Sequence, residues 1–532
     1  MWAVSRGGRP GRRGHGWAGV AAVAAALGWV AGSEVAGPGL AVASPGLDTV
    51  VQDDGQLLHR SPAQVQAMMA QLRFLGVDTV RLTADWSQLA PRAHSRRTPR
   101  FRATDPGAYP EARWAGLDAA VRAATGERLR VMIDIGFWAP RWAGRAPGPR
   151  ERTHIDARAY ARFAVAVARR FNGRFTPGGA RQALPEVNTF ALWNEPNHPT
   201  FLMPQWRRGG SDRGSGSQPA SADDYRAMVQ AAYPSVKRVR PRTVILIGNT
   251  SSRGGRPPLG PVAPLAFVRA LACVDSGYRP VRTGTCSHFA RVPGDGFAHH
   301  PYSLLGAPDS RGHHGDVLLG NLGELEACLS RLVRMGRLAP GLRDLYLTEL
   351  GYETHRVPHH PRISEATQAR YLTWSEYLAW RVPRVRMFAQ FLLRDQPAAK
   401  TVRSDSPLRP YGQFYSGLER ADGSAKPGLW SFMAGLFAQR APAGEVLLWG
   451  RLRLAVASAE VAIQRRLPGQ AWETIGTTSE GGGDAPTSFV VGGHDAFERF
   501  TGFVRGASYR LALRRPDGAW AAGLAVPVVE SR

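Results

Sequence analysis

The sequence predicts an α/β fold, a (β/α)8 TIM barrel, followed by a small all-β sandwich domain. From Thr49 onward, short apolar runs alternate with amphipathic stretches, a pattern typical of parallel strands joined by helices. After Arg440 the helical stretches stop, and short alternating runs are separated by Gly, Pro and Asp turns, which is typical of a sandwich. The chain of 532 residues also exceeds what one hydrophobic core normally covers. We therefore expect two folded domains.

The short apolar runs are the candidates for the barrel strands. They are Thr49–Gln52, Thr79–Leu82, Arg130–Ile135, Thr189–Trp193, Val244–Gly248, Gly296–His299, Leu345–Thr348 and Arg386–Phe391. The amphipathic stretches predict helices at Pro62–Leu75, Trp114–Ala124, Ala157–Phe171, Ala222–Arg240, Pro264–Leu271, Leu322–Met335, Ser364–Trp380 and Pro427–Ala438. Eight strand–helix units indicate a closed barrel with its functional groups on the loops after the strands. The alternative, an open doubly wound sheet, requires a phosphate-binding glycine turn after the first strand. Asp53-Asp54-Gly55 is not such a turn.

The predicted barrel covers residues 44–440 and the sandwich covers residues 441–532, with Ala441-Pro442-Ala443-Gly444 at the boundary. Strands of the sandwich are expected at Glu445–Trp449, Val461–Gln464, Phe489–Val491, Tyr509–Leu513 and Gly523–Val528. Two roles are open for the sandwich. It could bind polysaccharide through Trp449, Trp472 or Trp520, or it could pack against the barrel. We favour packing, because no planar row of aromatic residues is visible.

The N-terminus, residues 1–43, predicts a signal peptide. Several arginines precede an apolar run from Trp17 to Val30, and Ala41-Val42-Ala43 gives the small-x-small pattern of a cleavage site. The alternative is a membrane anchor, but the apolar run is short against the roughly 20 residues that a span needs. We therefore expect a secreted, extracellular protein.

A formal net charge of +26 raises the question of nucleic-acid binding. The positive charge is almost all arginine, scattered along the chain, and lysine occurs only at Lys237, Lys400 and Lys426. No helix-turn-helix, zinc-finger or RNA-binding signature accompanies it, so we expect no nucleic-acid partner. A weak contact with anionic cell-wall polymers stays open as a surface effect.

Three cysteines are present, Cys273, Cys286 and Cys328. In an exported protein, Cys273 and Cys286 can close a short loop, which stabilises a fold by about 3 kcal/mol in the chain-entropy model. Cys328 is then left over, and we expect it to be buried as a small apolar residue. Metal binding is the poorer interpretation, because no Cys-x-x-Cys or His-x-x-x-His pair accompanies these residues.

Two of the predicted barrel strands are followed by a glutamate. Glu195 follows the run ending in Trp193, and Glu349 follows the run ending in Thr348. A carboxylate is costly to keep in a core, and the strand ends of a barrel meet at one face. The sequence therefore predicts paired carboxylates facing one cleft, about 5 Å apart, which is the equipment for cleaving a glycosidic bond with retention of configuration. Glu353 competes with Glu349 for its role.

The residues around these glutamates resemble the retaining glycoside hydrolases of clan A, such as the cellulases and xylosidases of families 5 and 39. The resemblance covers about residues 47–440 and rests on Asn194-Glu195-Pro196, Glu349, Val80-Arg81-Leu82 and His300-Pro301-Tyr302. It implies that Glu195 is the acid/base and Glu349 the nucleophile. The sequence departs from the pattern at the end of the eighth strand, where Gln390 and Phe391 stand at the place of a tryptophan.

The same resemblance gives the supporting residues their roles. It implies that Arg81 braces the nucleophile, that Asn194 holds the 2-hydroxyl of the sugar, and that His300 and Tyr302 line the subsite of the cleaved sugar. Trp138 is a further candidate for substrate binding, because aromatic faces stack on sugar rings and this residue follows the third strand.

Together these features predict a secreted retaining glycoside hydrolase that cleaves β-O-glycosidic bonds by double displacement. The expected partner is an oligo- or polysaccharide. No metal or organic cofactor is implied, since two carboxyl groups suffice for the reaction. The alternative is a non-catalytic carbohydrate-binding or cell-surface protein on a relic barrel.

Overall fold

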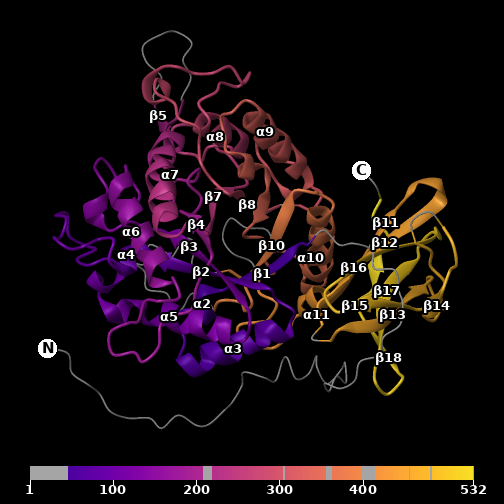
Figure 1. Ribbon diagram of the computed structural model, residues 1–532. Coiled ribbons are helices and arrows are strands. Elements are labelled where there is room, and N and C mark those ends of the chain that lie inside the picture. Colours follow the sequence, from indigo (N-terminus) through magenta and orange to yellow (C-terminus); the bar gives the residue numbers. More distant parts are fainter. Residues whose placement is uncertain are drawn as a thin grey trace.

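Eight parallel strands close into a barrel in the first part of the chain (Figure 1). The computed structural model describes residues 46–207, 218–303, 306–354, 362–397, 414–454, 456–479 and 482–530. Around the barrel the strands follow the order β1-β10-β9-β8-β7-β4-β3-β2. Their bounds are β1 Asp48–Gln52, β2 Thr79–Asp85, β3 Arg130–Gly136, β4 Thr189–Leu192, β7 Val244–Ser251, β8 Gly296–His300, β9 Leu345–Leu347 and β10 Val385–Phe391. The predicted fold class is confirmed, and each predicted barrel strand is present.

Helices cover the outside of this barrel, as the amphipathic stretches predict. They are α3 Pro62–Phe74, α5 Glu111–Gly126, α6 Ala157–Arg170, α7 Ala220–Val239, α8 Pro264–Leu271, α9 Leu322–Arg334 and α10 Glu365–Trp380. The first of them begins where its sequence indicates, because Ser61 and Gln64 form a reciprocal capping box and Pro62 occupies the first helical position. The barrel interior is filled by a separate apolar cluster that includes Val50, Met132 and Leu246.

The C-terminal domain is built from two antiparallel sheets. One has the order β11-β12-β16, and the other contains β14-β13-β17-β18 with β15 and β19 at its edges. The strands are β11 Ala434–Arg440, β12 Glu445–Leu452, β13 Ser458–Arg466, β14 Glu473–Ile475, β15 Phe489–Gly492, β16 Ala496–Gly502, β17 Ser508–Arg514, β18 Trp520–Ala522 and β19 Val526–Pro527. The predicted sandwich is confirmed, although β11, β14, β16 and β18 were not among the expected strands.

The predicted helix Pro427–Ala438 is wrong in its second half. The helix α11 covers only Pro427–Met433, and the next residue starts β11. Each residue of β11 pairs with β12, from Ala434 opposite Leu452 onward, so the ladder supplies the backbone hydrogen bonds that a longer helix would have supplied. The sandwich therefore begins before the predicted boundary at residue 441.

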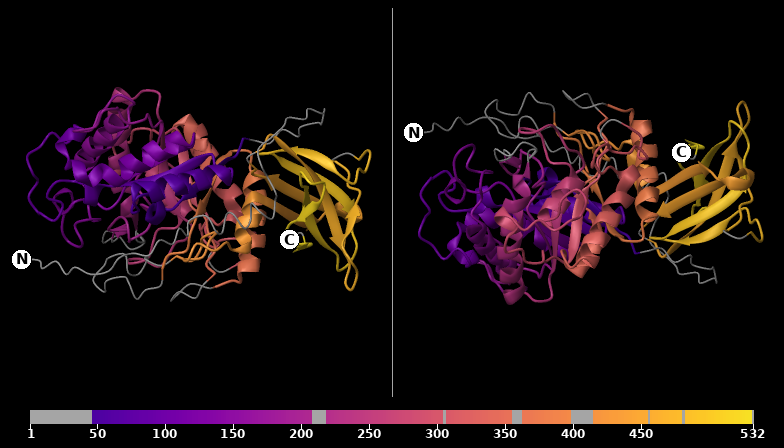
Figure 2. Two further views of the ribbon diagram at one scale, coloured as in Figure 1. Left: turned by 90° about the horizontal axis from the view of Figure 1, so that it is seen from below. Right: turned by 90° about the horizontal axis from the view of Figure 1, so that it is seen from above.

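The sandwich packs against the barrel through α10 (Figure 2). Trp449 is fully buried, with its ring centroid 5.7 Å from that of Tyr377 and 5.9 Å from that of Trp380. On the same strand, Arg451 donates to the carboxylate of Glu376 at 2.7 Å, and Arg453, just after the strand, contacts the same carboxylate. Trp449 thus takes part in packing, as favoured from the sequence.

The structure also settles the cysteines. Cys273 and Cys286 form a disulfide bond with their Cα atoms 5.7 Å apart, and Cys328 is buried and forms no disulfide bond. The predicted signal peptide, residues 1–43, lies outside the described residues. Within the described part of the chain, no helix combines the length and the apolar character of a membrane span.

Candidate active site

Glu195 and Glu349 lie at the same end of the barrel, because β4 and β9 are both parallel strands that end just before them. One oxygen of each carboxylate and one ring nitrogen of His300 all lie within 4.8 Å of one another. The side chain of Glu195 is 15% exposed and that of Glu349 is 12% exposed. The two carboxylates therefore lie side by side and both stay partly exposed to solvent, at about the separation expected from the sequence.

The backbone around Glu195 is held in an unusual conformation. Trp193 and Glu195 have φ angles of 66° and 36°, in the left-handed region that residues with a side chain seldom adopt. Asn249, at the end of β7, stabilises this turn, because its carbonyl accepts from the Glu195 N–H at 2.9 Å and its side-chain amide donates to the Trp193 carbonyl at 2.6 Å. Conformations of this kind persist where surrounding contacts enforce them, and they concentrate at functional sites.

Asn249 also connects the two glutamate-bearing segments. Its side-chain oxygen accepts from the Thr348 hydroxyl at 3.0 Å, directly before Glu349. Sequence reasoning did not single out Asn249. A signal for it was present, since an amide in a fully buried strand end needs polar partners.

Arg81 is completely buried in the barrel and forms hydrogen bonds to several residues of the site. Its guanidinium donates to Glu349 at 2.5 Å, to Asp134 at 2.9 Å and to the side-chain oxygen of Asn194 at 3.0 Å, and it also contacts Gln52. The bracing contact to Glu349 that the resemblance implies is thus present. The nearby carboxylate of Asp85 instead caps α4 (Trp86–Leu89).

Asp134, in β3, is a second residue that sequence reasoning missed. It is fully buried, and burial raises its pKa to about 7, while the charge of Arg81 lowers it. Its other oxygen accepts from the amide of Asn249 at 3.3 Å. The signal was the same as for the glutamates, namely an acidic residue within a buried apolar run.

His300, the last residue of β8, and Tyr302, just after it, contact the two glutamates directly. The Nδ1 atom of His300 lies 3.0 Å from Glu195 and 3.6 Å from Glu349. The Tyr302 hydroxyl donates to Glu349 at 3.3 Å. Burial lowers the pKa of His300 to about 4, so its ring is neutral near pH 7.

Each oxygen of Glu349 has its own donor, Arg81 on Oε1 and Tyr302 on Oε2. Two carboxylates and an imidazole at this spacing are also a metal-ligand set. The Arg81 guanidinium, 2.5 Å from Glu349, already supplies this carboxylate with a positive charge and would repel a cation bound beside it. The donor pattern therefore fits a carboxylate pair better than a metal centre.

The two glutamates differ in what controls their protonation. Burial raises the pKa of both. For Glu349, the charge and hydrogen bond of Arg81 and the hydrogen bond from Tyr302 act in the opposite direction. For Glu195, the contact with His300 lowers the pKa, whereas the charge of Glu349 raises it further. The arrangement favours the charged form at Glu349 and the proton at Glu195.

Other candidates take different places. Glu353 accepts from the backbone N–H of Tyr415 at 2.6 Å, so it does not share the contacts of Glu349. The indole N–H of Trp138 donates to the Thr200 carbonyl at 2.7 Å and its ring stacks near Phe201. No contact among the described residues joins Trp138 to the glutamates, and its role as a sugar platform stays a prediction.

Two polar residues beside the site, His299 and Gln390, have structural contacts and do not reach the glutamates. His299, next to His300, contacts the Thr250 hydroxyl at 2.8 Å and the Val317 carbonyl at 3.0 Å, so it is a packed imidazole of the core. Gln390 donates to the Ser416 carbonyl at 2.8 Å. It is buried and holds the loop after β10.

Comparisons with known proteins give a likeness in fold. No family model matches the chain, and no curated protein matches it. Among solved structures, a monomeric β-xylosidase from Caulobacter crescentus CB15 is 14% identical with a TM-score of 0.46, over 90% of this chain and 98% of that chain. A GH5_18 protein from Streptomyces cattleya, in complex with GlcNAc, is 14% identical with a TM-score of 0.42, over 73% of this chain and 79% of that chain.

A third similar structure is the exo-β-1,4-mannosidase Op5Man5 from Opitutaceae bacterium strain TAV5. It is 13% identical with a TM-score of 0.41, over 73% of this chain and 58% of that chain. All three likenesses are distant and concern the fold alone.

Proposed function

We propose that this chain is a retaining glycoside hydrolase that cleaves β-O-glycosidic bonds, with Glu349 as nucleophile and Glu195 as acid/base. One observation carries the proposal, the placement of the two carboxylates with oxygens within 4.8 Å. Retaining enzymes hold their carboxyl groups about 5–5.5 Å apart, whereas inverting enzymes need about 6.5–9.5 Å to admit a water molecule. The separation thus supports direct attack by one carboxylate.

In the first step, a Glu349 oxygen attacks the anomeric carbon while Glu195 gives its proton to the departing glycosidic oxygen. In the second step, Glu195 takes a proton from water, and the oxygen of that water displaces Glu349 from the anomeric carbon. Asn194 is the proposed partner of the sugar 2-hydroxyl, and its side-chain oxygen is already oriented by Arg81. His300 and Tyr302 complete the subsite around the cleaved sugar.

The proposed substrate is an oligo- or polysaccharide, and the proposed location is outside the cell, supported by the signal-peptide pattern of residues 1–43. The chemistry of the carboxylate pair requires no cofactor. A weak contact with anionic cell-wall polymers fits the net charge of +26.

The decisive experiment replaces Glu349 by alanine and screens aryl β-glycosides. We expect Glu349→Ala to lose turnover and azide to restore part of it, because azide occupies the place of the missing carboxylate, attacks the anomeric carbon opposite the leaving group and yields an α-glycosyl azide. Glu353→Gln is the matched control, since its carboxylate binds the Tyr415 backbone instead. Full activity of Glu349→Ala would reject the assignment of the nucleophile.

A second measurement separates the proposal from its alternatives. Proton NMR of the first product formed should show the β-anomer, whereas a site that activates water directly would release the α-anomer. Tight glycan binding in calorimetry without any hydrolysis would instead favour the non-catalytic, carbohydrate-binding interpretation.

A further inference from the structure

Two adjacent hollows lie on the outer wall of the barrel, away from the paired glutamates. Their cavity volumes are about 450 Å³ and 420 Å³, and they share Thr104, Arg162 and Arg169. None of the residues of the candidate active site lines either of them. The first hollow lies between α6 and the loop before η1 (Pro106–Ala108), and the second lies between α6 and α7.

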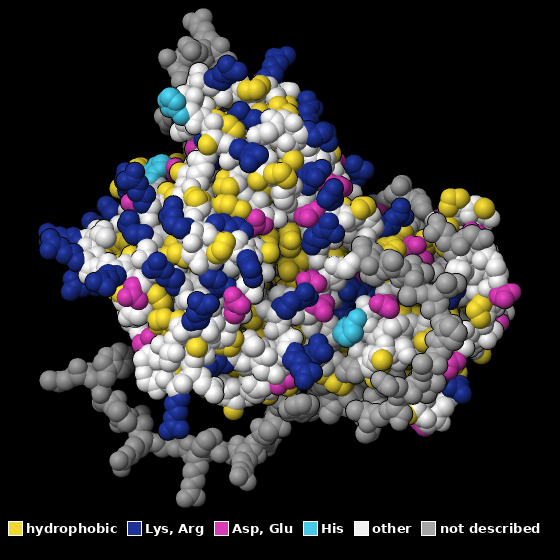
Figure 3. Space-filling view, in the orientation of Figure 1, with side chains coloured by type: hydrophobic (Ala, Val, Ile, Leu, Met, Phe, Trp, Pro, Cys, Tyr) yellow, Lys and Arg dark blue, Asp and Glu magenta, His cyan; other side chains and the backbone are white. Residues whose placement is uncertain are grey.

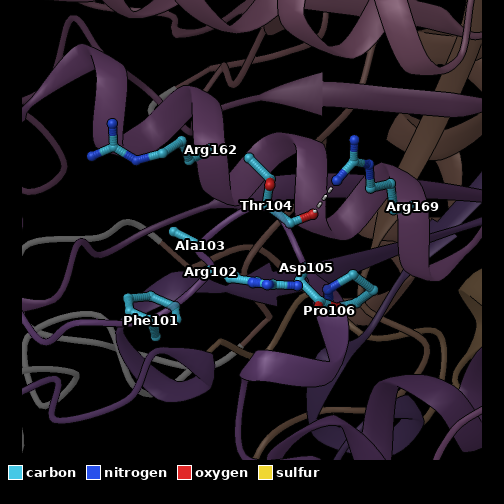
Figure 4. Close-up of a pocket in the computed structure, with 8 residues that line it drawn as sticks. All are labelled: Phe101, Arg102, Ala103, Thr104, Asp105, Pro106, Arg162 and Arg169. Atoms are coloured by element: carbon cyan, nitrogen blue, oxygen red, sulfur yellow. Dashed lines mark hydrogen bonds between the residues drawn. The ribbon is translucent and has the colours of Figure 1, made fainter.

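The lining of these hollows is strongly basic. The arginines that line them are Arg102, Arg158, Arg162, Arg169 and Arg238. Asp105 is the one acidic residue among the lining residues, and its carboxylate accepts from the Gly107 N–H at 2.9 Å. No described carboxylate lies within ion-pair distance of these arginines. Arg169 donates to the Thr104 carbonyl at 3.1 Å (Figure 4), a neutral partner that leaves its charge uncompensated.

This lack of acidic partners distinguishes the group from arginines elsewhere in the fold. Arg170, the next residue on α6, is buried and contacts both Glu111 and Asp118 at 2.5 Å. Lys and Arg side chains are spread over the visible face of the molecule (Figure 3), so charge alone does not define a site. What defines this site is that its arginines line a hollow and have no carboxylate partner among the described residues.

The arginines of α6 form a row. Positions 158, 162 and 169 are spaced by four and seven residues, which places them on one face of a helix. With a rise of 1.5 Å per residue, the row extends over about 16 Å. Arg162 and Arg169 extend from the helix on either side of Thr104 (Figure 4). Arg238 of α7 contributes to the wall of the second hollow.

The two hollows, joined along the arginine row of α6, are called the groove below. We propose that this groove binds a linear polymer that carries repeated phosphate groups and no bases. A row of about 16 Å fits a repeating charge better than a single small anion, and the planar guanidinium matches phosphate oxygens in a bidentate manner. Single-stranded nucleic acid is the less suitable occupant, because bases need aromatic stacking surfaces and Phe101 is the one aromatic side chain in the lining. The groove would hold the protein on a phosphate-bearing polymer while the carboxylate pair stays free.

The test measures binding of fluorescently labelled inorganic polyphosphate to the full chain at about 150 mM salt. The triple variant Arg158→Gln/Arg162→Gln/Arg238→Gln removes three exposed arginines of the groove. We expect it to bind about 10- to 100-fold more weakly than the wild type, since each arginine near a dense anionic array contributes severalfold. The matched control Arg60→Gln/Arg73→Gln/Arg334→Gln removes three exposed arginines outside the groove and should bind within threefold of the wild type.

Equal losses in both triple variants would show that binding follows net charge, which overturns the site. Wild-type affinity in the groove variant, or no binding by the wild type, would overturn it as well. Single-stranded DNA and polygalacturonate serve as competitors. If either binds more tightly than polyphosphate through the same arginines, the proposed occupant is wrong. Thermal unfolding of both variants controls for folding, and none of these readouts depends on the proposed hydrolase activity.

Discussion

Replacing Arg81 by methionine tests whether the buried guanidinium acts on Glu349 or only fills space. Arg81 and Glu349 are in contact at 2.5 Å, and unit charges whose centres lie about 4 Å apart interact by about 4 kcal/mol at an effective dielectric constant of about 20. If the transition state depends on that charge, Arg81→Met should lower kcat/KM by about a thousandfold. Because Arg81 lowers the pKa of Glu349, its removal should move the acidic limb of the pH profile to higher pH.

The same substitution has a structural cost that must be separated from its catalytic effect. Asp134 would lose its ion pair while it stays fully buried, which costs about 3–5 kcal/mol of unfolding free energy. The double variant Arg81→Met/Asp134→Asn removes that unpaired charge. It should regain much of the stability in a urea titration while kcat/KM stays low. Recovery of activity together with stability would refute a direct action of Arg81 on Glu349.

Three further predictions concern other contacts. His300→Phe removes the contact that lowers the pKa of Glu195, so the alkaline limb of kcat/KM should move to higher pH; an unchanged or lower limb contradicts this. Glu376→Gln leaves two guanidiniums of the sandwich buried without their carboxylate and should cost about 3–5 kcal/mol of unfolding free energy, measured by urea titration. Cys273→Ser/Cys286→Ser opens the disulfide loop and should cost about 3 kcal/mol; equal stability of oxidised wild type and variant would contradict that value.

The barrel could be predicted from the sequence because each of its strands is a short buried run, and because helices such as α6 and α9 have a strong amphipathic pattern. The error at Ala434–Ala438 has a physical reason. These residues are apolar in sequence, so local pattern alone does not separate a helix from a buried strand, and pairing with β12 decides for the strand. The two strands form a hairpin across residues 441–444, and the apolar run by itself does not reveal that pairing.

The residues of the candidate site also divide into those that the sequence predicts and those that it does not. Glu195 and Glu349 stand out because carboxylates at the ends of apolar runs are costly, and the parallel strands bring them together. Asp134 contacts the site indirectly, through Arg81, and Asn249 holds the backbone of residues 193–195. Their partners come from other strands, so their importance becomes visible only when the barrel is closed.

The contacts around the pair also explain how one carboxyl group, that of Glu195, can act as acid in the first step and as base in the second. Before attack, the charge of Glu349 raises the pKa of Glu195, which keeps the acid protonated. Once Glu349 forms a covalent bond to the sugar, that charge is lost, and the neighbouring guanidinium of Arg81 is no longer balanced by it. Both changes lower the pKa of Glu195, so it becomes a base when water must be activated. A trapped glycosyl-enzyme should therefore show a lower Glu195 pKa than the free protein in a carboxyl-selective NMR titration, and an equal or higher value would contradict this coupling.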